Sequence, residues 1–509
     1  MKHFWTRKKP AGPDSEGLLI EFEDNNRDIT EENVKTILAD SSDIIYQEHY
    51  INGNRNLPVM VVYVDGMIDL KLVNNDILKP LTQEKSFGEV KGFQDVISLI
   101  EQGTVYHAAR KIRTSLGELL SDILNGSAAL VFEKEKRAVT FDAKGFEKRA
   151  ITEPTNENAV KGPKDAFVEV LRVNTSMVRL KIHTPYLRIK ETIVGRQSRT
   201  NVAVIYIENL TNANIVKEVF ERLDAIDVDA VMAAGYIEEF IVDKRRSPFP
   251  QVLNTERADK FCDNIIEGRV GILIDGMPIA YIVPADITLF FQAPEDYAYH
   301  YLISSFIRLL RYGSFFIALF LPAFYVSITT FHQEMIPTVL AVSIIKSKID
   351  VPFPTITSMV GIMVAFEMLL EAGIRLPRAV GQAVSIIGAL VVGQAAVQAK
   401  LLSPVAVIVI AVTGIAGFVI PNQDLNNGVR IFRMIFTLCA SVAGLYGLAL
   451  AYIMLVYHLS SIETFGVPYL APLFAGDGKE SVKDTLIRMP LPFLKNRPQS
   501  LKAENKKRQ

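Results

Sequence analysis

The stretch Gly313–Phe331, GSFFIALFLPAFYVSITTF, decides the class of this protein, because none of its 19 residues carries a charge. An α-helix rises about 1.5 Å per residue, so the stretch would extend about 28 Å, close to the ~30 Å hydrocarbon core of a bilayer. Ser403–Ile420 and Ile435–Leu459 also lack Asp, Glu, Lys and Arg, whereas helices of soluble proteins keep one polar face. Gly313–Phe331 therefore predicts a spanning helix of a polytopic membrane domain.

The roughly 300 residues before this stretch have the patterning of soluble protein. Val59–Val64 is a run rich in β-branched residues that ends at Asp65-Gly66, and Asp275–Pro278 stands between two further runs of this kind, which predicts strands joined by tight turns. The polar segment Thr152–Lys164 predicts a linker, and no internal repeat is strong enough to argue from. We predict an α/β soluble N-terminal region of two subdomains, followed by an all-α polytopic membrane domain.

The predicted domains are cytoplasmic subdomains at residues 1–155 and 156–300, a transmembrane domain at 301–460 and a basic cytoplasmic tail at 461–509. The start lacks the apolar core of a signal peptide and the tail is rich in Lys and Arg, so both ends are expected in the cytoplasm. That arrangement requires an even number of crossings. Five segments are long enough, so we expect five to six helical segments. Either Met335–Ile345, which is short and contains Pro337, completes a sixth, or another segment is re-entrant.

Composition excludes several classes of function. A net charge of −1 argues against a nucleic-acid-binding surface. Two distant cysteines make neither a disulfide framework nor a zinc site. The sequence contains no phosphate-binding loop, no Gly-x-Ser-x-Gly motif and no His-Glu-x-x-His motif. We therefore expect no enzymatic activity, no cofactor and no metal site.

Candidate functional residues in the membrane domain fall into two groups. Gly381, Ser385, Ala389 and Gly393 recur every four residues, which predicts a helix face for close packing, within one subunit or between subunits around a pore. Gln394 and Gln398 are also four apart, and amides at membrane depth face protein or water.

Glu367 is the one acidic residue inside an apolar run, and a carboxylate there suggests an ion or proton role. The alternative is that Glu367 begins the solvated end of its helix, with Glu371 and Arg375 one and two turns on, or forms a structural pair with Arg375. Arg308 and Arg311, just ahead of the first span, are expected to face lipid headgroups.

Prolines and charged clusters complete the set. Prolines in or beside the spans predict broken helices, which favour a pathway or a moving gate without separating channel from carrier; they are Pro322, Pro337, Pro352, Pro354 and Pro421. In the soluble region, Glu256-Arg257 and Glu267-Gly268-Arg269 are charged clusters near turns. Such clusters most often form salt bridges and helix caps, and here they are also candidates for coupling to the membrane domain.

Taken together and in this order, the motifs closely resemble the A subunits of spore germinant receptors, the GerA family of endospore-forming bacteria. The resemblance covers roughly residues 60–480. It rests on Gly162-Pro163, Phe167, Asn174, Arg179, Ser247–Gln251, Thr255–Asp259, Glu267–Val270, Asp275–Pro278, Glu295–Tyr297, Leu321–Tyr325, His332–Thr338, Pro352–Pro354, Glu371–Pro377 and Gly388–Val397.

The resemblance implies a subunit of a nutrient-sensing complex in the inner membrane of the spore. It further implies a homo-oligomeric ring whose membrane helices form a cation pathway, and two partners: a B subunit resembling an amino-acid transporter, and a C subunit that is a lipoprotein. The chain departs from the family pattern at three positions. Ala258 stands where a proline is usual, and Ser358 and Met363 stand where two acidic residues are usual. We therefore take six residues as candidates for the pore or its gate: Glu367, Ser358, Met363, Gln394, Gln398 and Pro337.

Two other functions stay open for this sequence. Broken helices and Glu367 would also suit an ion-coupled carrier. A non-conducting scaffold, or a paralogue acting downstream of the receptor, would need the spans only for docking in the lipid membrane.

Overall fold

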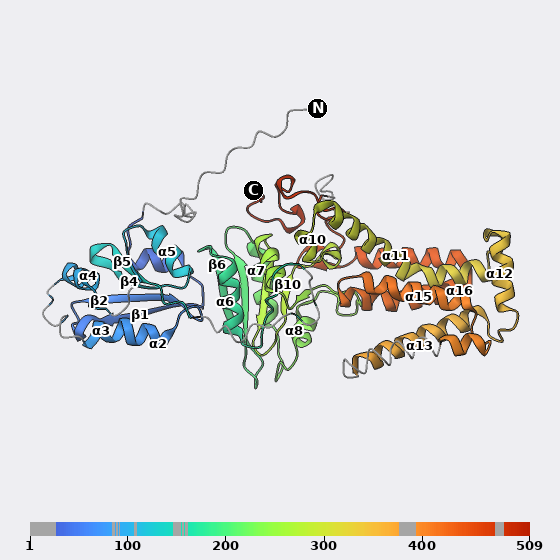
Figure 1. The fold of residues 1–509 in the computed structure, drawn as a ribbon, viewed down its shortest axis with the longest axis horizontal. Coiled ribbons are helices and arrows are strands. Elements are labelled where there is room, and N and C mark those ends of the chain that lie inside the picture. Colours follow the sequence, from blue (N-terminus) through green and yellow to red (C-terminus); the bar gives the residue numbers. More distant parts are fainter. Residues whose placement is uncertain are drawn as a thin grey trace, which may run out of the picture.

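The computed structural model describes residues 27–83, 87, 90, 92–105, 109–145, 154, 157, 161–375, 393–473 and 483–508. Two α/β subdomains follow one another, and a helical bundle extends beyond the second (Figure 1). We call the two subdomains together the N-domain. The end of the bundle beside the N-domain is its near end, and the opposite end is its far end. The predicted fold class is confirmed.

Subdomain 1 is an antiparallel sheet in the order β1-β2-β4-β5-β3 with helices on both faces. Its sheet is two-sided because residues alternate along each strand: Val59, Val61 and Tyr63 of β2 join one buried cluster, and Met60 and Val62 join the other. The elements are α1 (Glu31–Ile37), β1 (Ile44–Tyr50), β2 (Pro58–Val64), α2 (Leu70–Leu72), α3 (Lys79–Gln83), α4 (Phe93–Gln102), β3 (Arg110–Arg113), α5 (Leu116–Leu124), β4 (Ala128–Phe132) and β5 (Arg137–Phe141).

Subdomain 2 has a second antiparallel sheet, in the order β6-β7-β9-β10-β8. Its elements are α6 (Leu171–Lys181), β6 (Leu187–Val194), β7 (Thr200–Ile207), α7 (Ala213–Asp224), α8 (Ala234–Ile241), β8 (Leu253–Thr255), α9 (Ala258–Ile266), β9 (Val270–Ile274) and β10 (Ala280–Val283). The predicted turn at Asp275–Pro278 joins β9 to β10, and Gly276 there has φ +80, which a glycine adopts without strain.

The two subdomains share one topology, although the sequence shows no clear repeat. In each sheet the first, second, fourth, fifth and third strands lie side by side in that order. Both units also enter the fourth strand from a helix through a left-handed glycine, Gly126 (φ 86) before β4 and Gly268 (φ 102) before β9. The two subdomains match in strand order and in which positions are buried. Different apolar residues can fill the same buried position, so the repeat does not appear as sequence identity.

Within the part of the chain that the structure describes, three helices are long and apolar enough to cross a membrane: Tyr301–Thr330, Thr355–Gly373 and Gln423–Ser460. The bundle elements are α11 (Tyr301–Thr330), α12 (Thr338–Lys348), α13 (Thr355–Arg375), α15 (Pro404–Val419) and α16 (Gln423–Ser460), and the short α10 (Glu295–Ala298) precedes them. The predicted span Gly313–Phe331 falls in α11 except for its last residue, Phe331, which caps the helix.

The helix α16 folds back on itself. Its backbone leaves the helical conformation at Ala443 and Gly444, and the rings of Phe432 and His458 come within 5.9 Å of each other. In a straight helix those two residues would lie about 39 Å apart. Both ends of α16 also touch subdomain 2, since Asp424 accepts from Asn254 at 2.6 Å and His458 bonds Ser247 at 2.9 Å. Thus α16 passes along the bundle twice.

The reversal gives α16 two passes, whereas the total number of crossings stays a prediction. Met335–Ile345 does not complete a pass: most of it belongs to α12, which lies across the far end of the bundle (Figure 1). Lys400 pairs with Asp350 at that far end, at 2.6 Å, whereas α13 ends at Arg375 toward the near end. The described helices of the bundle begin with α11 and end with α16 beside the N-domain.

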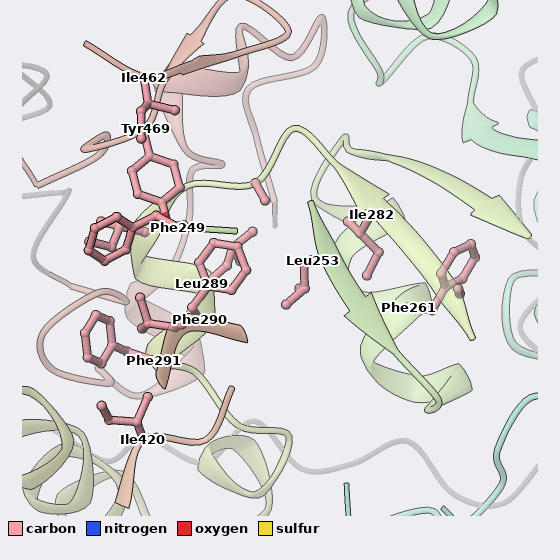
Figure 2. Packing of buried hydrophobic residues seen from close by; sticks show 14 of the residues in the cluster. Phe249, Leu253, Phe261, Ile282, Leu289, Phe290, Phe291, Ile420, Ile462 and Tyr469 are labelled. Carbon is pink, nitrogen blue, oxygen red and sulfur yellow. The ribbon is translucent and has the colours of Figure 1, made fainter. Parts of the chain in front are cut away.

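One buried apolar cluster joins subdomain 2, the bundle and the tail. Figure 2 shows its centre, where side chains from all three parts meet: Phe249, Leu253, Phe261, Ile282, Leu289, Phe290, Phe291, Ile420, Ile462 and Tyr469. The tail adds the two short strands β11 (Glu463–Thr464) and β12 (Val467–Pro468) and then folds over subdomain 2, where the Glu504 amide donates to the Leu210 carbonyl at 3.0 Å. Because core packing transmits displacement with little compression, subdomain 2 and the near end of the bundle act as one body.

Candidate functional site

A buried group of charged side chains lies where the chain enters the bundle, and we call it the junction cluster. It consists of Asp296 of α10, Arg308 and Arg311 of α11, and Asp484 and Arg508 of the tail. Asp296 accepts from Arg308 Nε at 2.8 Å and from Arg311 Nη1 at 2.8 Å. Arg308 and Arg311 are three residues apart and therefore share one helix face.

The tail completes the junction cluster. Asp484 Oδ1 accepts from Arg308 Nη1 at 3.1 Å, and its Oδ2 accepts from the Tyr297 hydroxyl at 3.0 Å and lies 3.4 Å from Arg508 Nη1. Burial raises the pKa of the Asp484 carboxyl, and the neighbouring Arg308 charge opposes this shift. The prediction that Arg308 and Arg311 face lipid headgroups is wrong, because both side chains are buried against Asp296.

Glu267 and Arg269, two of the candidate coupling residues, border this cluster. The Arg269 side chain is 2% exposed and pairs with both Glu267 and Asp286, while Glu267 lies 3.5 Å from Arg508. Burial raises the pKa of Asp286, and the charge of Arg269 opposes this shift. A chain of ion pairs therefore leads from the loop between α9 and β9 of subdomain 2 through the tail to α11.

Glu256 and Arg257, the other two candidates, lie at the opposite end of α9. The Arg257 side chain is 1% exposed; it pairs with Asp259 at 2.7 Å and donates to the Pro163 carbonyl at 2.8 Å. The Glu256 carbonyl accepts from the Phe167 amide at 2.7 Å. This end of α9 holds the linker against subdomain 2, and Ala258 occupies the first helical position, where a proline would also fit.

Glu367 lies in a second charged group, inside the bundle. Its carboxylate pairs with Arg433 of α16 at 2.7 Å and also with Arg430. Arg375, the partner considered from sequence, instead pairs with Glu371. Two guanidinium groups therefore face one carboxylate, which favours a structural role for Glu367 over the attraction of cations.

The other candidate residues of the bundle are dispersed. Ser358 and Met363 are buried at 7% and 2% exposure, on the face of α13 that meets α11, α15 and α16, and Pro337 precedes α12. Gly393, Gln394 and Gln398 lie in a short helical stretch, and both glutamines are exposed. Gly381, Ser385 and Ala389 fall outside the described residues, so the small-residue stripe remains a prediction.

Sequence reasoning missed the partners in both charged groups. Asp484 is one of several acids in a basic tail, and Arg430 and Arg433 lie just ahead of the apolar stretch Ile435–Leu459. Their partners are 176 and more than 60 residues away along the chain. The sequence held one signal for these partners. Arginines inside or beside apolar helices need acidic partners, so their positions indicated that such partners exist.

We expect Glu367→Gln to destabilise the bundle, because Arg433, 5% exposed, would keep its charge and lose its carboxylate. Breaking a fully buried pair costs about 3–5 kcal/mol, and the partial exposure of Glu367 reduces this to about 1–3 kcal/mol. The melting temperature of the purified protein should fall. Glu371→Gln, which breaks the exposed pair with Arg375, is the matched control and should melt like the wild type. Equal melting of all three proteins would show that the Glu367 charge is not structural.

Comparison with known proteins places this chain in a family. The family model described as Bacillus/Clostridium GerA spore germination protein matches residues 32–500. Spore germination protein KA of Bacillus subtilis is 40% identical over 475 residues, which is 93% of this chain and 86% of that protein. Spore germination protein GerLA of Bacillus cereus is 35% identical over 496 residues, 96% of this chain and 98% of that one.

A solved structure is also similar. The crystal structure of the N-terminal domain of the A subunit of the Bacillus megaterium spore germinant receptor GerK3 has 29% sequence identity and a TM-score of 0.41, and the match covers 51% of this chain and 97% of that one. The family match over nearly the whole chain agrees with the resemblance seen in the motifs. This chain belongs to the GerA family of spore germination proteins.

Proposed function

We propose that this chain is the A subunit of a nutrient germinant receptor. In this proposal it is inserted in the inner membrane of the spore, with the N-domain and the tail in the cytoplasm. Several copies surround a cation pathway that opens when nutrient is sensed and so triggers germination. The partners are a B subunit resembling an amino-acid transporter, which receives the nutrient, and a lipoprotein C subunit. The chain itself catalyses no reaction.

The junction cluster is the observation that carries this proposal. Arg308 is fully buried and bonds both Asp296 of α10 and Asp484, so α11 is attached at one level to the segment that leads out of subdomain 2 and to the tail. A buried ion pair holds its geometry because separating the charges inside protein is costly. A displacement of subdomain 2 is therefore passed to the first membrane helix rather than absorbed by a flexible hinge.

The exposure of α13 supports assembly with further copies. Only 17% of its most apolar stretch is buried, against 50% for α11. Val364 and Met368 lie on the uncovered side, at 45% and 68% exposure. A helix that its own subunit covers so little can move relative to the bundle or pack on a neighbouring subunit, and it carries Ser358, Met363 and Glu367. We propose that α13 and the segment with Gln394 and Gln398 border the pathway.

The proposal is tested in spores that retain only this receptor. Deleting the chain should abolish potassium release after nutrient addition. Restoring it as Asp484→Asn should slow the release without lowering the amount of protein, because the tail then holds Arg308 more weakly. Asp227→Asn, in an exposed pair with Arg196, is the control and should behave like the wild type. Release that persists after deletion would exclude this function.

A further inference from the structure

The two arginines that face Glu367 border an open hollow on the side of the bundle. The hollow has a volume of about 540 Å³ and is lined by Glu367 and Met363 of α13 and by Asn427, Arg430, Ile431 and Arg433 of α16, among others. Arg430 Nη1 also bonds the Asn427 side-chain oxygen at 3.0 Å. Polar groups therefore gather on one wall of the hollow, and apolar side chains form the rest.

The charges around this hollow do not balance. Glu367 supplies one negative charge for the two positive charges of Arg430 and Arg433. The Arg433 side chain is 5% exposed, and its buried Nε has no hydrogen-bond partner among the described residues. An unbalanced charge inside a membrane costs several kcal/mol, and that cost falls when a counter-ion is bound. The hollow therefore favours a bound anion.

The position of the hollow matches the level of lipid headgroups. The first residues of α16, Gln423–Asn427, are polar, and Asp424 bonds Asn254 of subdomain 2. Arg430 follows this polar start by about one turn, and a long arginine side chain extends further toward the surface. On the facing helix, Glu371 and Arg375 are exposed and continue toward the same end. Phosphate groups of the near leaflet are thus within reach of the arginines.

An apolar strip leads away from the arginines toward the far end. Ile431, Ile435, Leu438 and Val442 lie on one face of α16 and are 51%, 39%, 48% and 79% exposed. Their spacing of four, three and four residues makes the strip continuous along the helix. A ligand with a negatively charged head and a long apolar chain would pair with the arginines and also cover the apolar strip. A free anion would only pair with the arginines.

A second copy of the chain is a weaker source for the missing negative charge. Among the described residues of α11, α13, α15 and α16, the acids other than Glu367 are Glu371 and Asp424. Glu371 already pairs with Arg375 at 2.6 Å, and Asp424 accepts from Asn254. Both would have to leave those partners, whereas a phospholipid phosphate brings its own charge.

We propose that the hollow between α13 and α16 binds an anionic phospholipid of the near leaflet. Its phosphate contacts Arg430 and Arg433, and one acyl chain lies along the strip from Ile431 to Val442. The bound lipid neutralises the excess positive charge and connects α13 to α16. This site does not depend on the proposed role in germination, because it rests on the charge balance and exposure of the bundle alone.

The test uses the purified full-length protein in nanodiscs of neutral phosphatidylcholine, or of the same lipid containing a fraction of phosphatidylglycerol. The wild type should melt several degrees higher with the anionic lipid and should retain it during purification. Arg430→Gln leaves a balanced pair between Glu367 and Arg433, so it should fold in neutral lipid. It should lose the gain and bind phosphatidylglycerol roughly fivefold more weakly, which corresponds to one arginine–headgroup contact.

Two controls separate this site from general attraction and from free anions. Arg375→Gln removes an exposed arginine of the same region and should keep the gain. Inorganic phosphate added to neutral nanodiscs should give no gain, because it lacks the acyl chain. The proposal is overturned by a wild type that melts equally in both lipids, by an Arg430→Gln protein with the full gain, or by an equal gain from phosphate. If Arg430→Gln yields no protein, the lipid and phosphate arms on the wild type still decide.

Discussion

Asp296→Asn is expected to destabilise this protein by about 3–5 kcal/mol. Asp296 is 1% exposed and accepts from both Arg308 and Arg311, which are 0% and 6% exposed. Asparagine keeps the shape but removes the charge, so Arg311 loses its carboxylate and Arg308 retains only Asp484. Removing one member of a buried ion group costs about 3–5 kcal/mol, because the remaining charge stays buried without a partner.

The effect of Asp296→Asn is measured by thermal unfolding of the detergent-solubilised full chain. For a chain of 509 residues, a loss of this size should lower the melting temperature by about 3–5 °C. Asp227→Asn breaks an exposed pair of similar length with Arg196, and it should leave the melting temperature unchanged. If Asp296→Asn melts with the control, the junction cluster does not hold α11 to the N-domain.

Asp43→Asn should release subdomain 1 from subdomain 2. Asp43 precedes β1 and binds Arg179 of α6 through two contacts, at 2.8 and 3.0 Å, with both side chains fully buried. The exchange leaves the Arg179 charge buried against a neutral amide, at a cost of about 3–5 kcal/mol. Subdomain 1 should stay folded, because its two apolar clusters consist almost wholly of its own residues.

Hydrogen exchange measures the loss of contact between the two subdomains directly. The Ser42 amide donates to the Ile189 carbonyl across the boundary at 2.7 Å, and it should exchange faster in Asp43→Asn while the amides of β2 stay protected. The control is Asp40→Asn in the same loop, whose pair with Lys190 is solvent-exposed and should matter little. Unchanged exchange at Ser42 in Asp43→Asn would show that apolar packing alone joins the subdomains.

The sequence predicted the features that depend on local patterning. Gly313–Phe331 lies in a membrane-length helix, and Val59–Val64 is a strand, because continuous apolarity and β-branched runs act within one element. The reversal at Ala443 and Gly444 was not predicted, because it sits inside the apolar run Ile435–Leu459, which predicts one continuous helix. Two close glycines were its local signal: Gly444 adopts φ +61, and Gly447 packs on the Cys439 carbonyl.

The charged sites could not be predicted from the sequence for a different reason. Arg308 has the usual position of a headgroup-facing arginine, and only the fold shows that α10 and the tail cover it. Glu367 looked like a lone carboxylate until α16 brought two arginines to it. An ion pair between residues far apart in the chain depends on how the helices pack. The sequence around one charged residue therefore does not identify its partner.

The most direct test of the central claim is a combined measurement on the protein purified with its co-purifying partners. The mass of the cross-linked complex gives the number of copies of this chain. The rate of potassium efflux from vesicles that contain the same complex shows whether it forms a cation pathway. We predict several copies of this chain and a nutrient-dependent efflux, and Asp484→Asn should reduce the efflux while the copy number is kept. A single copy per complex, or efflux no greater than from protein-free vesicles with the nutrient present, would contradict the account.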